Sequence, residues 1–152
     1  MSRRSQIAMS TEEIDAYLHE SHLCRIGTIG PKGDIHLVTM NYGFVDGNVA
    51  FWTYKAAQKT KNLERNPTLS VLVDSGYKYS ELKGVSMSGT AELRDDPEVM
   101  LEFGRSLAGR YGGPMKGATG EAARASSTKR VVVILHPTKI MSWDHTKLGG
   151  TY

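Results

Sequence analysis

The sequence predicts a mainly β domain of the α+β class, an antiparallel barrel of six or seven short strands with two or three helices. Short apolar segments rich in β-branched and aromatic residues recur along the chain, and tight turns join most of them. Capped amphipathic segments stand between some of these strands. At 152 residues with 39% hydrophobic composition the chain can bury one core, so we expect a single domain over 1–152.

Seven segments have strand composition, and turn signals separate them. The strongest signal is Asp46-Gly47-Asn48, because Asp-Gly between two apolar segments is typical of a tight hairpin. Pro31-Lys32-Gly33-Asp34 predicts a second hairpin turn, and His136-Pro137 predicts a turn between the last two strands. The expected strands lie at residues 22–29, 35–45, 49–54, 68–74, 85–94, 130–135 and 139–143.

Three segments have helical patterns. A Ser-x-x-Glu capping box at its start predicts a helix over 10–20. Residues 55–65 are rich in alanine, lysine and glutamine, which predicts a second, shorter helix. Asp96 can cap the free amides of a third helix that has Pro97 in its first turn. Residues 110–127 are rich in glycine and have few large apolar side chains, so we expect a loop there that could cover a cleft.

Composition and charge exclude several classes of protein. The net charge of +3 comes from 19 basic and 16 acidic side chains spread along the chain, which is too weak for nucleic-acid binding and suits an anionic small ligand. The one cysteine, Cys24, has no partner in the chain, which fits a reducing compartment. No apolar run reaches the roughly 18 residues of a membrane helix, and none of signal-peptide length follows the first arginines. We expect a cytoplasmic protein that binds neither membrane nor nucleic acid.

None of the familiar catalytic templates fits the sequence. The five histidines show neither His-Glu-x-x-His nor zinc-ligand spacing, so we expect no metal site. The glycines at 112–117 lack the spacing of a phosphate-binding loop. Ser126-Ser127-Thr128-Lys129 satisfies Ser-x-x-Lys, but the companion motifs of penicillin-binding enzymes are absent. No catalytic residue is assigned from the sequence.

The most informative segment is 51–63, where an expected strand leads directly into an expected helix. Lys55 and Lys59 are four residues apart and would share a helix face, with Thr53 before them and Asn62 after. The free amides and positive dipole end of the helix would add to a site for an anion such as phosphate. Lysines on a solvated helix face show the same spacing, and spacing alone favours that alternative.

The order of motifs resembles that of the pyridoxamine-5′-phosphate-oxidase-like split-barrel superfamily. It is most similar to the actinobacterial branch of reductases that use the deazaflavin coenzyme F420. The match covers nearly the whole chain, and it is the order and spacing of the motifs that are specific. The motifs are Ile26-Gly27-Thr28, HLVTMNYG (36–43), Phe51-Trp52-Thr53, Gln58-Lys59, Asn62-Leu63, Asn66-Pro67, YSELKGVSMSG (79–89), Ser142-Trp143-Asp144-His145 and Lys147-Leu148.

This resemblance implies an FMN-binding split barrel that works as a homodimer, with the cofactor in a groove between the two subunits. Thr39, Met40 and Asn41 would lie along the tricyclic ring, where their backbone would bond its pyrimidine part. The expected phosphate ligands are Thr53, Lys55 and Lys59, with Asn62 beside them. The residues expected to reach the cofactor from the partner subunit are Asp74, Ser75, Tyr79 and Trp143. For Trp143 a place in the core is an equal alternative.

The activity implied by the resemblance is hydride transfer from reduced F420 to a conjugated or heteroaromatic small-molecule acceptor. The cofactor supplies the redox chemistry, and the protein orients it and excludes water. Two alternatives remain open. One is an FMN-dependent enzyme similar to pyridoxamine-phosphate oxidase, and the other is a carrier or storage protein that binds F420 or a flavin without turnover.

Overall fold

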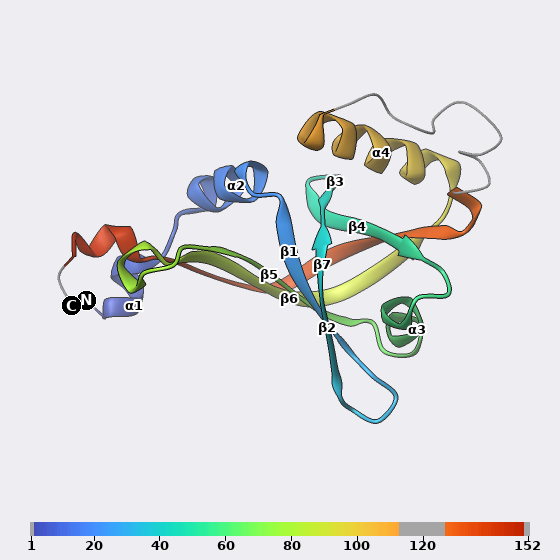
Figure 1. The fold of residues 1–152 in the computed structure, drawn as a ribbon, viewed down its shortest axis with the longest axis horizontal. Coiled ribbons are helices and arrows are strands. Elements are labelled where there is room, and N and C mark those ends of the chain that lie inside the picture. Colours follow the sequence, from blue (N-terminus) through green and yellow to red (C-terminus); the bar gives the residue numbers. More distant parts are fainter. Residues whose placement is uncertain (1, 113–126, 151–152) are drawn as a thin grey trace.

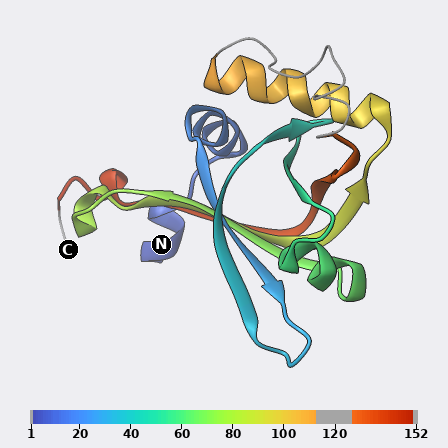
Figure 2. The ribbon, with the colours of Figure 1, turned by 45° about the vertical axis from the view of Figure 1, so that its right-hand side comes forward.

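A computed structural model describes residues 2–112 and 127–150, and its centre is a seven-stranded antiparallel sheet. The strand order is β2-β1-β5-β6-β7-β4-β3, so the sequence neighbours β2 and β3 form opposite edges of the sheet (Figure 1). The sheet curls into an incomplete barrel (Figure 2), which confirms the predicted α+β split barrel. The strands are β1 (Leu23–Ile29), β2 (Ile35–Asn41), β3 (Gly43–Val45), β4 (Asn48–Tyr54), β5 (Thr68–Ser75), β6 (Lys83–Arg94) and β7 (Arg130–Asp144).

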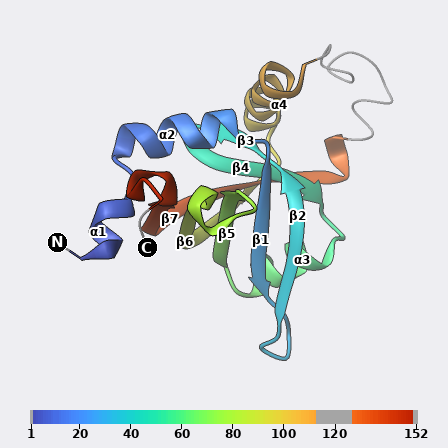
Figure 3. The ribbon, with the colours of Figure 1, turned by 60° about the vertical axis from the view of Figure 1, so that its left-hand side comes forward.

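Four α-helices flank this sheet in the described part of the chain, one more than the largest number expected. The helices are α1 (Arg3–Ile7), α2 (Thr11–Glu20), α3 (Gln58–Arg65) and α4 (Pro97–Tyr111), and the 3-10 turns are η1 (Tyr79–Glu81) and η2 (His145–Leu148). α1, η1 and η2 gather at one end of the sheet (Figure 3). None of the described helices is both long and apolar enough to cross a bilayer.

The predicted caps and the predicted hairpin are present. Ser10 and Glu13 form a reciprocal capping box at the start of α2, and the Asp96 side chain accepts from the Val99 amide at the start of α4. Asp46 and Gly47 both have positive φ, 49° and 75°, as a type I′ turn between β3 and β4 requires. These features depend on neighbouring residues only, which is why the sequence predicted them.

The predicted turn at His136-Pro137 is wrong, because β7 runs through it as one strand. β4 pairs with β7 only as far as Ile134, so Pro137 lies where one edge of β7 is free, and proline is tolerated there. The register of β6 against β7 shifts between Ser88 and Gly89. A Cβ on Gly89 would lie 2.0 Å from the His136 carbonyl oxygen, so glycine permits this close approach.

Three other boundaries also differ from the expected ones. The expected strand over 35–45 is interrupted at Tyr42, where the chain passes from one sheet edge to the other. α3 begins at Gln58, because residues 55–57 form a turn in which the Ala57 amide donates to the Tyr54 carbonyl. α4 extends to Tyr111, past the start of the expected loop, and residues 113–126 of that loop lie outside the described residues.

Two buried clusters stabilise the structure. The larger fills the barrel and includes Cys24, where burial raises the pKa of the thiol to about 12. The smaller lies between α4 and the outer side of β3, β4 and β7, with Phe103 at its centre. The apolar run 131–135 is buried throughout because one side of β7 faces the barrel and the other faces α4.

Candidate functional site

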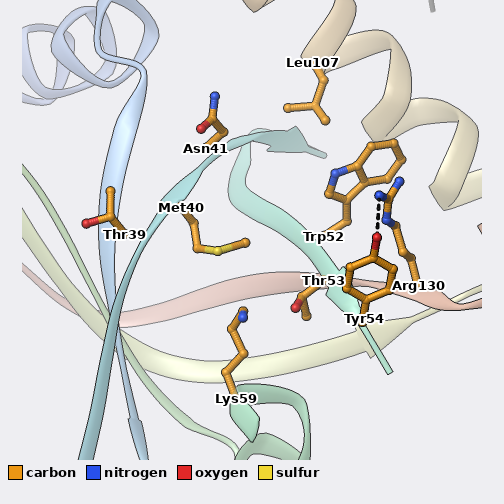
Figure 4. A pocket seen from close by; sticks show the side chains of 9 residues that line it. All are labelled: Thr39, Met40, Asn41, Trp52, Thr53, Tyr54, Lys59, Leu107 and Arg130. Carbon is orange, nitrogen blue, oxygen red and sulfur yellow. Dashed lines mark hydrogen bonds between the residues drawn. The ribbon is translucent and has the colours of Figure 1, made fainter. Parts of the chain in front are cut away.

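A cavity of about 370 Å³ opens where β2 and β4 diverge at the split in the barrel. Side chains from β2, β4, α3, α4 and the start of β7 face it (Figure 4). Its lining residues are Thr39, Met40, Asn41, Trp52, Thr53, Tyr54, Lys59, Leu107 and Arg130. Five of the eleven predicted site residues, Thr39, Met40, Asn41, Thr53 and Lys59, therefore meet in one cavity.

Lys59 and Thr53 lie together on the lining of this cavity and were both predicted as phosphate ligands. Lys59 is half-buried in the first turn of α3, and burial lowers the pKa of its ammonium from the usual 10.5. Within residues 2–112 and 127–150 no carboxylate pairs with it. The N-cap residue of α3 is Ala57, which offers no side-chain acceptor to the first amides of the helix. An anion placed here would therefore meet an unpaired ammonium group, uncapped amides and the Thr53 hydroxyl.

The opposite wall is the end of β2. In the described sheet this strand pairs with β1 alone, so its second backbone edge is open. Thr39 and Asn41 are exposed, and Met40 between them is half-buried toward the barrel. The unpaired N–H and C=O groups along this edge can form hydrogen bonds with the edge of a flat heterocycle, as they would with a neighbouring strand.

Arg130 is a lining residue that the sequence did not predict. It is the β7 partner of Tyr54 in the sheet register, and its guanidinium carbon lies 5.0 Å from the Tyr54 ring centroid. The same carbon lies 4.9 Å from the ring of Trp52, the residue two before Tyr54 on β4. The sequence carries only a weak signal for this contact. Alternation along the strand places Trp52 and Tyr54 on one face, but no local pattern predicts that Arg130, 76 positions after Tyr54, lies beside them.

The predicted phosphate ligand Lys55 and the predicted cofactor-binding residue Asn62 lie outside the cavity lining. The Lys55 ammonium pairs with Asp95 at 2.7 Å, and this hydrogen bond and the charge attraction lower the pKa of the Asp95 carboxyl. Asn62 is fully buried and donates to the Thr28 hydroxyl at 3.0 Å, while its oxygen accepts from Gln58 at 2.8 Å. The hydrogen bond from Asn62 to Thr28 therefore links α3 to β1 inside the fold.

The remaining predicted residues lie outside the cavity lining, around the end of β5, the start of β6 and the end of β7; they are Asp74, Ser75, Tyr79 and Trp143. Asp74 pairs with Arg25, and the Ser75 hydroxyl bonds the Tyr17 hydroxyl at 2.8 Å. Trp143 lies over Gly84, where an added Cβ would be 2.3 Å from the indole.

Tyr79 packs edge-on against His145, with ring centroids 4.5 Å apart, and the His145 Nδ1 donates to the Tyr79 carbonyl at 2.8 Å. Trp143 and Arg130 lie near opposite ends of the strand β7. Arg130 lines the cavity, whereas Trp143 is not among the described residues that line it.

The described residues that line the cavity include no acid, base or nucleophile pair. The titratable groups among them are Lys59, Tyr54 and Arg130. Across the described residues, no three His, Cys, Asp or Glu side chains converge as metal ligands do. This lining is suited to binding and orienting a planar anionic ligand.

A family model and a solved structure both match this chain over most of its length. The family model described as pyridoxamine 5′-phosphate oxidase matches residues 10–144. A structure of the conserved hypothetical protein Rv2991 from Mycobacterium tuberculosis is 35% identical, with a TM-score of 0.86, over 100% of this chain and 95% of that one. No match was found among curated proteins.

Two more distant structures are alike in fold. A structure named F420 reductase is 23% identical, with a TM-score of 0.63, over 83% of this chain and 94% of that one. HutZ, a heme storage protein from Vibrio cholerae, is 15% identical, with a TM-score of 0.67, over 87% of this chain and 94% of that one. At these identities the likeness concerns the fold alone.

Proposed function

Because the chain belongs to the pyridoxamine 5′-phosphate oxidase family, we propose that it is an oxidoreductase that transfers a hydride from reduced F420 to a conjugated or heteroaromatic acceptor. The observation that carries the proposal is the shape and charge of the cavity at the barrel split. An anion-binding end made by Lys59 and Thr53 faces an open strand edge at Thr39–Asn41, with apolar walls between them.

The residues present fit a phosphate-bearing tricyclic coenzyme. Lys59 would hold the phosphate with the first amides of α3 and the Thr53 hydroxyl, and the backbone of Thr39–Asn41 would bond the ring edge. When bound, the coenzyme supplies the two-electron redox chemistry. Met40, Trp52 and Leu107 would exclude water and keep the acceptor against the ring.

The proposal includes a homodimer in which the second copy completes the site. Asp74, Ser75, Tyr79 and Trp143 do not line the cavity of their own chain, so in the proposed dimer they would reach the cavity of the partner copy. The outer side of β2 carries Ile35 and Leu37, which are 68% and 66% exposed. Two large aliphatic side chains exposed two residues apart on one sheet face support burial against a second subunit.

Titration of the purified protein with F420 and with FMN tests the choice of cofactor. The proposal expects tight F420 binding. Tight FMN binding without F420 affinity would favour the oxidase-like alternative, and binding of neither coenzyme would contradict both. Stopped-flow oxidation of bound reduced F420 by quinones, enones and tetrapyrroles then separates an enzyme from a carrier. A carrier would show no acceleration over free cofactor with any acceptor.

A further inference from the structure

Arg130 is held between two aromatic rings on the wall of the cavity. Its guanidinium carbon lies 4.9 Å from the Trp52 ring and 5.0 Å from the Tyr54 ring, and it donates to the Tyr54 hydroxyl at 3.3 Å. Trp52 in turn packs edge-on against the fully buried Phe103, with ring centroids 5.5 Å apart. The planar guanidinium is therefore oriented before any ligand arrives, which reduces the entropy lost on binding.

The charge of Arg130 is not neutralised within the residues that the structure describes. No Asp or Glu there forms an ion pair with it, whereas Arg25 pairs with Asp74 and Arg94 pairs with Asp96. One N–H group of the guanidinium donates to Tyr54, and within the described residues no carboxylate engages the others. The edge of a guanidinium matches the two oxygens of a carboxylate in a bidentate contact.

Lys59 and Arg130 lie on different sides of the cavity. Figure 4 shows the Lys59 ammonium beside Thr53 and Met40, whereas the Arg130 guanidinium lies beyond these residues, beside Trp52 and Tyr54. Leu107 of α4 and Trp52 add apolar surface on the Arg130 side. The cavity thus has two cationic positions with apolar side chains near them, and a single phosphate would occupy one of the two.

We infer that Arg130 binds the carboxylate of the acceptor, so that the preferred substrates are planar conjugated molecules with a carboxylate on one edge. The inference rests on the proposed function, which gives Lys59 and Thr53 to the cofactor and leaves Arg130 for a second anion. The conjugated body of the acceptor then lies against Trp52 and Leu107, within reach of the ring held along β2. Arg130 is in this sense a specificity residue, and it carries no proton or electron itself.

Calorimetric titration of the cofactor-loaded protein tests this with two unreactive probes, 2-naphthoate and 2-naphthamide. They have the same ring system and differ in charge. The wild-type protein should bind the carboxylate at least about tenfold more tightly than the amide, as expected for one charge-assisted bidentate contact. Arg130→Met should remove this preference and leave amide binding and cofactor affinity unchanged. Arg130→Lys should keep part of it, because the charge remains without the planar fork.

The matched control is Arg105→Met, which removes an exposed arginine of α4 outside the cavity lining and should keep the wild-type preference. Equal affinity of the wild-type protein for both probes, or no binding of either, would overturn the inference. Loss of cofactor affinity in Arg130→Met would also overturn it, because Arg130 would then hold the cofactor. If the wild-type protein binds no coenzyme, the proposed function fails. The same titration on the protein alone still tests the carboxylate site, because it needs no turnover.

Discussion

The Lys55 ammonium lies 2.7 Å from the Asp95 carboxylate, and the two form an ion pair. This pair lies outside the cavity, whereas Lys59 lines it. The two lysines are four residues apart, which would place them on one face of a helix. The chain between them is instead a turn followed by the first residues of α3, so their side chains diverge. The two positions should therefore respond differently to substitution.

Lys59→Met should weaken cofactor binding by about 1–3 kcal/mol, since one charge-assisted contact to phosphate is lost. Lys55→Met should change the affinity by less than about 0.5 kcal/mol, because an exposed ion pair contributes little and lies outside the cavity. Fluorescence titration with F420 and FMN measures both variants. Equal losses in the two would show that Lys55 also contacts the ligand.

Cofactor affinity should fall with rising pH, starting below the usual lysine pKa of 10.5, because burial lowers the pKa of Lys59 in the free protein. A bound phosphate favours the protonated amine and raises this pKa, so affinity is highest below the free pKa. Affinity is lost as the pH rises from the free to the bound value. Dissociation constants measured at successive pH values up to the usual lysine pKa of 10.5 should show the onset of this fall. Lys59→Arg should show a flat profile, because arginine stays charged throughout.

Asn62→Leu should lower the free energy of unfolding by about 1–3 kcal/mol, because the buried Thr28 hydroxyl loses its donor. Urea unfolding followed by circular dichroism measures it. The double variant Thr28→Val with Asn62→Leu should recover part of the loss, since both polar partners are then removed together. An Asn62→Leu protein of unchanged stability but lost cofactor affinity would return Asn62 to the list of ligand contacts.

Gly89→Ala should destabilise the fold by about 1–3 kcal/mol, because the new methyl group would lie 2.0 Å from a backbone oxygen of β7. The control is Gly109→Ala in α4, where a Cβ meets nothing within 4 Å. That change should stabilise the protein by about 0.5–1 kcal/mol through helix propensity. Urea midpoints in the same buffer compare the two, and a Gly89→Ala midpoint at or above wild type would contradict the close approach.

Leu37→Arg should convert the protein to a monomer and weaken cofactor binding, because a charge on the outer face of β2 would be buried in the proposed dimer. Leu101→Arg is the control, since Leu101 is 42% exposed on α4, away from that face. Sedimentation velocity gives the oligomeric state of each. A wild-type protein that is monomeric at micromolar concentration would contradict the dimer.

The parts of the fold that depend on neighbouring residues were predictable from the sequence. The Asp46-Gly47 hairpin and the Asp96 cap are examples, since short-range geometry decides both. The turn predicted at Pro137 was wrong, because a strand tolerates proline where its edge is unpaired. Whether β7 is unpaired at Pro137 depends on how far β4 extends along it, and no local sequence pattern shows this.

Prediction of the site depended on the same distinction. Lys59 and Thr53 come from one continuous segment, and Thr39, Met40 and Asn41 were found through a resemblance between whole motifs. Arg130 reaches the cavity only because β7 pairs with β4. The position of the Lys55 side chain likewise depends on a distant residue, because Lys55 forms an ion pair with Asp95, forty residues later.

Under the proposed dimer, the length of β7 implies that ligand affinity should depend on protein concentration. One strand places Arg130 at the cavity and Trp143 near its opposite end. If the second copy supplies the missing wall, a solitary chain has only half of the binding surface. Dilution below the dimer dissociation constant would then release the coenzyme, and added coenzyme would promote association by mass action.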